Sequence, residues 1–226
     1  VKYTGKAITS EDLSTVLGTD YDVVGIVEGQ TLTVTLGLAE GIEAIDADTY
    51  PEAITAKVTA NEVSANYDIT YGNNATLTVA KADLYTLKGV TFEDKTVSYT
   101  GTEHSIVAEN VPEGISVVYT DATQVNADTY TAKATFSFDK DNDILSKNYK
   151  TLVVENADEG TDTLTATLTI NKVKVTVTAE ARTATYTGNQ ITVNDLEEIT
   201  GTGYTVEGTV NNETLTVTLG IAENVN

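Results

Sequence analysis

The stretch "FDKDNDILSKNY" carries the most site-like spacing of charged side chains in the sequence. Asp139, Asp141 and Asp143 alternate along it. Hard oxygen ligands that converge from alternate positions of a loop are typical of calcium sites. The EF-hand pattern, however, has glycine at its sixth position and glutamate at its twelfth, where this chain has Ile144 and Lys150. Two hypotheses therefore stay open: calcium bound by the three aspartates, or a solvated hairpin loop.

The sequence lacks the combinations of residues that catalysis usually requires. His104 is the single histidine, in "TGTEHSI", and a triad would also need a positioned nucleophile and an orienting group. The absence of cysteine excludes disulfides and thiolate sites. Glycosidases need two carboxylates across a cleft, usually with aromatic platforms, but the chain has no tryptophan and its tyrosines, such as Tyr50, Tyr67 and Tyr130, fall in strand or turn motifs. We expect no enzymatic activity and, calcium apart, no cofactor.

Lysine and asparagine at strand ends could form an intramolecular isopeptide bond. Lys95 and Asn171 are a candidate pair, and carboxylates are abundant near both. The alternative is that the two residues are ordinary exposed side chains on facing strands, where such residues are common.

The net charge limits the classes of partner that the chain is expected to bind. The chain has 34 acidic and 13 basic residues, a net charge of −21. This argues against nucleic acid and anionic lipid, because phosphate binding needs clustered lysine and arginine. No apolar run approaches the roughly 18 residues of a membrane span. We therefore expect no nucleic-acid partner and no membrane insertion in this segment.

The elements that position these residues follow from an internal repeat. "TLTVTLG" occurs at 31–37 and again at 214–220, and residues 3–43 align without a gap with residues 186–226, with 22 identical positions. Inside the 183-residue period, the landmarks "YTG", "DADTY" or "NADTY", "NY" and "ATLT" recur in the same order. We infer an A-type repeat at 1–81, a B-type repeat at 82–172 and the opening of a second A-type repeat at 173–226.

Strands and one short helix are predicted from periodicity. Apolar residues alternate with threonine, of which the chain has 42, and this pattern indicates strands with one buried face. The residues expected to point inward are Leu164, Ala166, Leu168, Ile170, Leu32, Val34, Leu36, Val173, Val175 and Val177. A helix is predicted in "TSEDLSTVLG", with Ser10 as N-cap and Gly18 as its end, and again at 194–201 in the second A-type repeat.

These landmarks resemble the MBG/YDG-type repeats of large bacterial surface proteins and adhesins. The resemblance rests on "YTG", the "GxxYxVxGxVxxxTLTV" hairpin at 18–34, "DADTYP", "NYDITY" and "TLTVAKA". In the B-type repeat it rests on "SYTGTEHSI", "VPEGISVVYT", "NADTYTAKATF" and "ATLTINK". It implies tandem, β-rich, extracellular building blocks, and it supplies no catalytic residues.

We therefore expect a mostly β fold of tandem immunoglobulin-like sandwiches, with a β-grasp-like arrangement as the alternative for the A-type repeat. The expected function is a non-catalytic stalk of a cell-surface adhesin, outside the cell at its surface or wall, whose partners are neighbouring repeats. The alternatives are repeats that themselves bind a host glycan or protein, and a subunit of a surface layer or filament. Fold-level analogy does not choose among these.

Two expectations concern shape and completeness. Short joints at 81–82 and 171–172 predict a rod in which each repeat adds about 35 Å. Residues 173–226 match only the opening of an A-type repeat, so we expect a window onto a longer chain. That last part should need further strands, from absent sequence or from a neighbouring molecule, to cover its apolar face.

Overall fold

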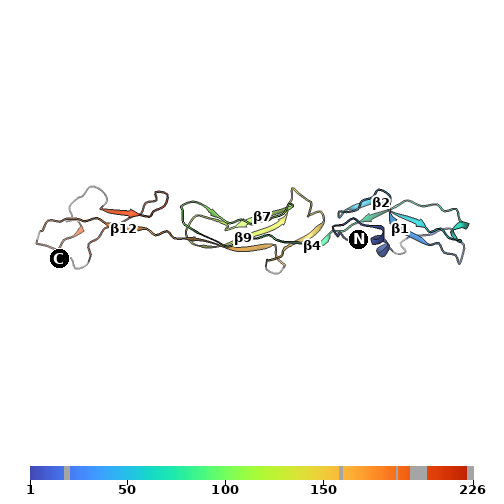
Figure 1. Ribbon diagram of the computed structural model, residues 1–226, viewed down its shortest axis with the longest axis horizontal. Coiled ribbons are helices and arrows are strands. Elements are labelled where there is room, and N and C mark those ends of the chain that lie inside the picture. Colours follow the sequence, from blue (N-terminus) through green and yellow to red (C-terminus); the bar gives the residue numbers. More distant parts are fainter. Residues whose placement is uncertain (18–20, 158–159, 187, 194–202, 223–226) are drawn as a thin grey trace. The chain divides into compact units, whose positions relative to one another are not determined.

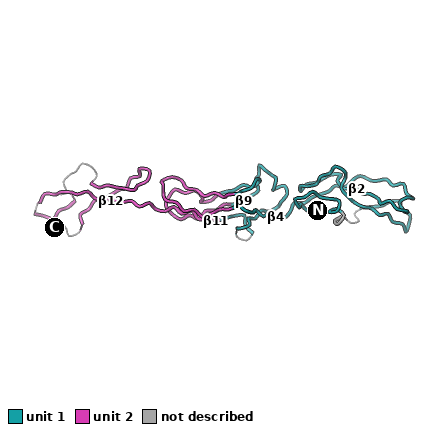
Figure 2. Tube along the Cα trace, viewed as in Figure 1, with its two compact units in different colours: residues 1–90, 110–118, 135–164 teal, residues 91–109, 119–134, 165–226 magenta. Residues whose placement is uncertain are grey.

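The computed structural model describes residues 1–17, 21–157, 160–186, 188–193 and 203–222 (Figure 1). Its contacts divide the chain into two compact units, coloured separately in Figure 2. Unit 1 consists of residues 1–90, 110–118 and 135–164, and unit 2 of residues 91–109, 119–134 and 165–226. The division into repeats at 81–82 and 172–173 stays a prediction.

The fold is mostly β, as predicted, with one α-helix and one 3₁₀-helix among the described residues. The elements are α1 (Ser10–Leu17), β1 (Val34–Leu38), β2 (Thr49–Val58), η1 (Ser64–Asn66), β3 (Ala75–Thr78), β4 (Ala82–Leu87), β5 (Lys95–Ser98), β6 (His104–Ser105), β7 (Ile115–Thr120), β8 (Thr123–Gln124), β9 (Thr129–Phe138), β10 (Tyr149–Val154), β11 (Thr163–Asn171), β12 (Thr176–Ala179) and β13 (Tyr204–Glu207). No helix in the described ranges is long and apolar enough to cross a membrane.

The strands in the described residues form five sheets. Their orders are β1-β2-β3, β10-β4, β5-β11-β9-β7, β12-β13 and β6-β8. The pairs β10–β4 and β11–β5 are parallel, whereas β1–β2, β2–β3, β6–β8 and β12–β13 are antiparallel. Parallel and antiparallel pairing therefore coexist in this chain.

In unit 1, the first heptapeptide copy continues into a paired strand. Strand β1 pairs with β2, with Leu36 opposite Ala56, and Leu36 is 8% exposed. Leu32 and Val34 are half-buried while the threonines between them are exposed, which confirms the predicted alternation. Leu36 joins a buried cluster made up of Ile8, Leu13, Leu36, Ala44, Ala53, Ile54, Leu77 and Val79.

Helix α1 is confirmed, but its predicted cap is wrong. Thr9, not Ser10, precedes the first helical residue, and the Thr9 hydroxyl and amide both donate to Asp12 Oδ2, at 2.7 and 2.8 Å. The Asp12 amide donates back to Thr9 Oγ1 at 3.3 Å, a reciprocal capping arrangement. Ser10 Oγ instead accepts the Leu38 amide at 3.1 Å, because it faces β1. Gly18 and the helix expected at 194–201 lie outside the described residues.

Strand β11 confirms the clearest alternation in the sequence. Leu164, Ala166, Leu168 and Ile170 are all buried, whereas the residues between them are half-buried or exposed. Beside it, Ala132, Ala134 and Phe136 of β9 are fully buried. The Phe136 amide donates to Asp162 O and the Ile170 amide to Asp128 O, so β9 and β11 run antiparallel.

The two repeat types share their backbone contacts. The Tyr3 amide donates to Ala80 O at 2.8 Å, and the equivalent Tyr99 amide donates to Asn171 O at 2.9 Å. The Val79 amide donates to Asp48 O, as the Ile170 amide does to Asp128 O, both at 2.9 Å. Landmarks that align in the sequence therefore occupy equivalent places in the two folds.

A tyrosine corner is another shared feature. The Tyr50 hydroxyl donates to Asp46 O at 3.0 Å, and the Tyr130 hydroxyl donates to Asn126 O at 3.1 Å. Each tyrosine thus bonds to the backbone four residues upstream, in "DADTY" and in "NADTY". Tyr50 lies in β2 and Tyr130 in β9, so both fall in strand motifs, as predicted.

The segment after Lys172 departs from the predicted burial. Val173 and Val177 are 37% and 46% exposed and Val175 is half-buried, so the face expected to be inward is largely open. Strand β12 pairs with β13, but the second heptapeptide copy, 214–220, forms no strand, and Leu215 is 46% exposed. Alternation alone does not bury these residues, because burial also requires packing partners on that side.

Candidate functional site

The predicted calcium loop is held by hydrogen bonds within the loop and to Glu113. Asp139 Oδ1 accepts the Asp141 amide at 2.9 Å, and Asn142 Nδ2 donates to Glu113 Oε1 at 2.9 Å. Within the described ranges, no three histidine, aspartate or glutamate side chains are arranged to hold a metal ion. Calcium at Asp139, Asp141 and Asp143 stays a prediction.

His104 lies in the short strand β6, opposite Gln124. Its Nε2 and the Thr100 hydroxyl are 2.8 Å apart, and the same hydroxyl is 2.8 Å from that of Thr102. Among the residues that the structure describes, no carboxylate bonds to the other ring nitrogen, so the structure does not assemble a triad around His104.

Lys95 and Asn171 are not brought together. Lys95 lies opposite Leu168 in the parallel pair of β5 and β11, whereas Asn171 lies opposite Ser98. The Lys95 ammonium donates to Ser105 O at 2.9 Å. The isopeptide candidate therefore lacks the contact that it needs.

The best-defined polar cluster of unit 1 centres on Asn148, which is 4% exposed. Its Oδ1 accepts the Ala47 amide at 2.7 Å, and its Nδ2 donates to Asp46 Oδ1 at 3.0 Å and to Ile144 O at 3.3 Å. The Asn148 carbonyl in turn accepts the Ala82 amide at 2.9 Å. One side chain thus links the "DADTY" landmark of the A-type repeat to the "NY" landmark of the B-type repeat, across the predicted boundary at 81–82. We call this cluster the Asn148 joint.

Charged groups surround the Asn148 joint. The Lys147 ammonium lies 3.2 Å from Asp46 Oδ2 and 3.7 Å from Asp48 Oδ2. Hydrogen bonds from Asn148 and then Lys147 lower the pKa of Asp46, and the bond to Asp46 raises the pKa of Lys147. The folded state therefore favours the ionised form of Asp46, which accepts hydrogen bonds from Asn148 and Lys147 in the joint.

A second ion cluster lies just after the boundary. Asp83 accepts from Lys150 at 2.7 Å and from Lys2 on its other oxygen. These hydrogen bonds, Lys150 first, lower the pKa of Asp83 to about 2. Because all three side chains are more than half exposed, the cluster contributes modestly to stability.

Aromatic rings pack beside these charges. Tyr3 and Tyr149 meet edge to face, with ring centroids 5.4 Å apart, and Tyr85 lies 5.0 Å from Tyr149. Burial, then the negative charges of Tyr149 and Asp46, raises the pKa of Tyr3. Edge-to-face rings add directional packing to the apolar contact at the joint.

Sequence reasoning identified these landmarks but missed that they contact one another. Asp46 and Asn148 are 102 residues apart, and asparagine and aspartate are common at surfaces. The constant order of "DADTY" and "NY" in both repeats marked the two segments but did not indicate that they meet.

A groove on unit 1 is lined by three tyrosines together with apolar, polar and glycine residues. They are Tyr21, Tyr67 and Tyr71, then Val23, Val24, Ile26, Leu32, Val34, Ala56, Val58 and Ile69, then Asp22, Asp68, Thr70, Gly25 and Gly72. The Tyr67 hydroxyl accepts the Val27 amide at 3.1 Å and bonds to Gln30 Oε1. Val24 is 95% and Tyr71 56% exposed, so apolar surface is open to solvent here.

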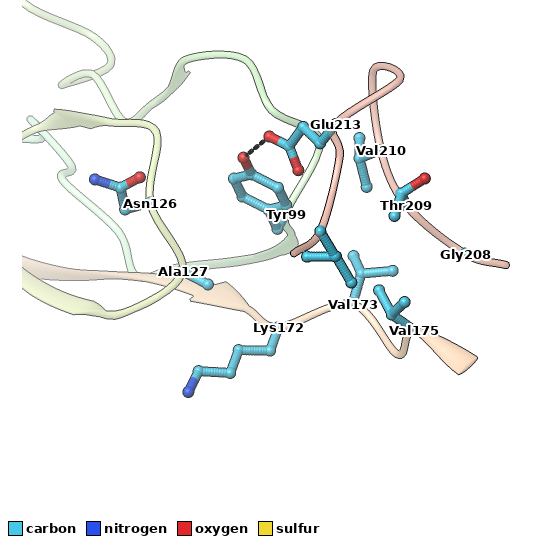
Figure 3. Close-up of a pocket in the computed structure, with 11 residues that line it drawn as sticks. Tyr99, Asn126, Ala127, Lys172, Val173, Val175, Gly208, Thr209, Val210 and Glu213 are labelled. Carbon is cyan, nitrogen blue, oxygen red and sulfur yellow. Dashed lines mark hydrogen bonds between the residues drawn. The ribbon is translucent and has the colours of Figure 1, made fainter. Parts of the chain in front are cut away.

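Unit 2 contains a pocket beside Tyr99, with a volume of about 320 Å³ (Figure 3). We call it the Tyr99 pocket. It is lined by Tyr99, Asn126, Ala127, Lys172, Val173, Val175, Gly208, Thr209, Val210, Glu213 and Leu215. The Tyr99 hydroxyl donates to Glu213 Oε1, and this bond raises the pKa of Tyr99 (Figure 3).

Asn211 fixes one rim of the Tyr99 pocket. Its Nδ2 donates to Thr100 O at 2.8 Å. Gly101 has φ +69°, and a Cβ there would lie 2.6 Å from Asn211 Nδ2. The positive φ favours glycine in this "YTG" landmark, and a larger residue would also displace the Asn211 side chain.

Comparisons with known proteins identify no relative: no family model, curated protein or solved structure matches the chain.

Proposed function

We propose that this chain is a non-catalytic structural segment of a bacterial cell-surface adhesin, a stalk that projects a binding region from the cell. It would stand outside the cell, at the surface or in the cell wall. The resemblance to tandem surface-protein repeats motivates the proposal, and the acidic charge is compatible with it.

The Asn148 joint is the observation that carries this proposal. A stalk transmits position from one repeat to the next, so its joints must resist bending. Lys81 donates to Ser146 O at 2.6 Å and leads directly into β4, which pairs with β10 from Ala82–Tyr149 onward. Hydrogen bonds, ion pairs and edge-to-face rings thus hold this boundary where a flexible linker would leave it free.

For the finer fold, we favour immunoglobulin-like sandwiches. The tyrosine corners of Tyr50 and Tyr130 support this assignment, because such corners are a hallmark of that architecture. A β-grasp-like arrangement is the alternative for the A-type repeat, and the packing of Leu13 from α1 in its core supports that reading.

Small-angle X-ray scattering of the full chain tests the stalk. We expect an extended particle to which each repeat adds about 35 Å. Inserting a Gly-Ser tetrapeptide between Lys81 and Ala82 should broaden the distribution of dimensions, whereas the same insertion after Gly29, at a loop turn, should not. A compact particle for the unmodified chain would overturn the proposal.

A second candidate function is direct binding of a host glycan or protein by the A-type repeat. The groove with exposed Tyr71 and Val24 favours it, since aromatic rings beside apolar surface are typical of recognition sites. A glycan array and a surface-protein panel test this function. Tyr71→Ala should abolish a genuine signal, and Tyr186→Ala, at a tyrosine 87% exposed elsewhere, should leave it unchanged.

A further inference from the structure

We propose that the Tyr99 pocket binds an Asn-Tyr segment from a further A-type repeat of the same polypeptide. This segment would be similar in sequence to residues 61–71. The asparagine would bond at Ala127, and the tyrosine hydroxyl would lie between Val210 and Glu213. This inference is independent of the stalk role, because it rests on two sets of contacts in unit 1, one made by Asn148 and Tyr149 and one made by the Tyr67 hydroxyl.

The first set of contacts that supports this proposal comes from the Asn148 joint. There the Ala47 amide donates to the Asn148 side chain, the Ala82 amide donates to its carbonyl, and the Tyr3 ring packs on Tyr149. When the repeats are aligned on their landmarks, Ala47 corresponds to Ala127, Ala82 to Val173 and Tyr3 to Tyr99. All three counterparts line the Tyr99 pocket.

The equivalence is structural as well as sequential. The Tyr3–Ala80 backbone bond recurs as Tyr99–Asn171, so the frame around the two places is the same. Around the Asn148 joint, that frame is filled by Asn148 and Tyr149. In unit 2, the corresponding space is the Tyr99 pocket.

The second set of contacts comes from the hydroxyl of Tyr67. In the first A-type repeat its hydroxyl accepts the Val27 amide at 3.1 Å and bonds to Gln30. A shift of 183 residues turns Val27 into Val210 and Gln30 into Glu213. Both line the Tyr99 pocket, and the Glu213 carboxylate, now bonded to the Tyr99 hydroxyl, can accept from a second phenol.

The two sets of contacts are independent, but their counterparts line the same pocket. One derives from contacts between an A-type and a B-type repeat, the other from contacts inside an A-type repeat. Their counterparts nevertheless line a single pocket of about 320 Å³, within the range of volumes that hold small ligands. An Asn-Tyr pair satisfies both sets of contacts at once.

The A-type repeat also carries the Asn-Tyr pair that the pocket is proposed to bind. Asn66 is exposed, whereas its counterpart Asn148 is 4% exposed, because Asn148 is covered by the "DADTY" landmark of the preceding repeat. An A-type repeat that follows a B-type repeat would cover its own asparagine in the same way. Tyr67 already bonds to Val27 and Gln30 of its own unit, which disfavours its donation to a second molecule and favours a segment of the same polypeptide.

The experiment adds a synthetic peptide with the sequence of residues 44–82 to the full ¹⁵N-labelled chain. We expect saturable shifts of the Ala127 and Val210 amide signals, the counterparts of the two donors in unit 1. An Asn66→Ala peptide should bind about threefold to tenfold more weakly, since it loses the bond from the Ala127 amide. A Tyr67→Phe peptide should lose at least as much affinity, since the hydroxyl would bond both Val210 and Glu213. An Asn73→Ala peptide, altered at an exposed loop residue, should bind like the original.

Variants of the chain locate the contact. Val175→Asp places a charge in the Tyr99 pocket and should abolish binding, whereas Thr176→Asp, one residue along and exposed, should not. No shift at millimolar peptide, or equal binding by the two variants, overturns the proposal. Shifts of Ala127 and Val210 that depend on chain concentration without peptide would identify a second copy as the occupant and overturn it as well.

Discussion

The same seven residues have different structures at the two ends of this chain. At 31–37 the heptapeptide runs into β1, pairs with β2 and buries Leu36 to 8% exposure. At 214–220 the identical sequence forms no strand, and Leu219, the counterpart of Leu36, is only half-buried. Propensity and alternation are equal in the two copies, so neither explains the difference. The partner strand does, because pairing and burial on a β face come from neighbouring strands.

The largest expected effect tests this difference directly. Leu36→Ala should cost about 2–4 kcal/mol of the free energy of unfolding, because it leaves a cavity in a closed core. Leu219→Ala should cost less than about 1 kcal/mol, since its side chain is half-buried. Urea unfolding followed by resolved amide signals of each region measures both. Equal losses would mean that the second copy is also packed in solution.

The next effect compares the two "NY" landmarks. Asn148→Ala should destabilise unit 1 by about 1–3 kcal/mol, because Ala47 and Asp46 lose a buried partner. Asn66→Ala removes an exposed side chain that bonds the Glu62 carbonyl and should cost about 0.5 kcal/mol or less. Thermal unfolding of each variant gives the comparison. A larger loss for Asn66 than for Asn148 would contradict the assignment of the joint.

A smaller effect concerns the helix that covers the first copy's core. Thr9→Ala removes the hydroxyl that bonds to Asp12 and should cost about 1 kcal/mol. Hydrogen exchange of the Leu13 amide reports on the helix. Thr4→Ala, at an exposed threonine of the same loop, serves as the control and should leave this exchange unchanged.

The smallest effect is electrostatic. The pKa of Asp83 is lowered in the folded state, so its ion pairs stabilise above the ordinary aspartate pKa and are lost as the pH falls toward about 2. The wild type should therefore lose more stability than Asp83→Asn between pH 6 and pH 2. The expected difference in melting temperature is under about 2 °C. Identical pH profiles would show that the pairs with Lys2 and Lys150 do not persist in solution.

Local pattern predicted the elements better than their surroundings. The alternation in β11 and the helix at Ser10–Leu17 depend on neighbouring residues, and both are present. The cap was misplaced by one residue, although the Thr-x-x-Asp spacing at Thr9–Asp12 recurs at Thr192–Asp195 and could have indicated it. The burial of Val173 and Val177 and the Asn148 joint were beyond such reasoning, because each depends on residues distant in the sequence.

The parallel pair of β5 and β11 has a mechanical consequence. The chain enters this pair at Lys95 and leaves it at Asn171, with Lys95 opposite Leu168 and Ser98 opposite Asn171. Tension on the polypeptide therefore pulls the two strands lengthwise in opposite directions. Such a load is shared by every hydrogen bond of the pair at once, whereas peeling strands apart breaks bonds one after another. A protein held at one end and dragged by flowing liquid at the other would resist rupture through this geometry.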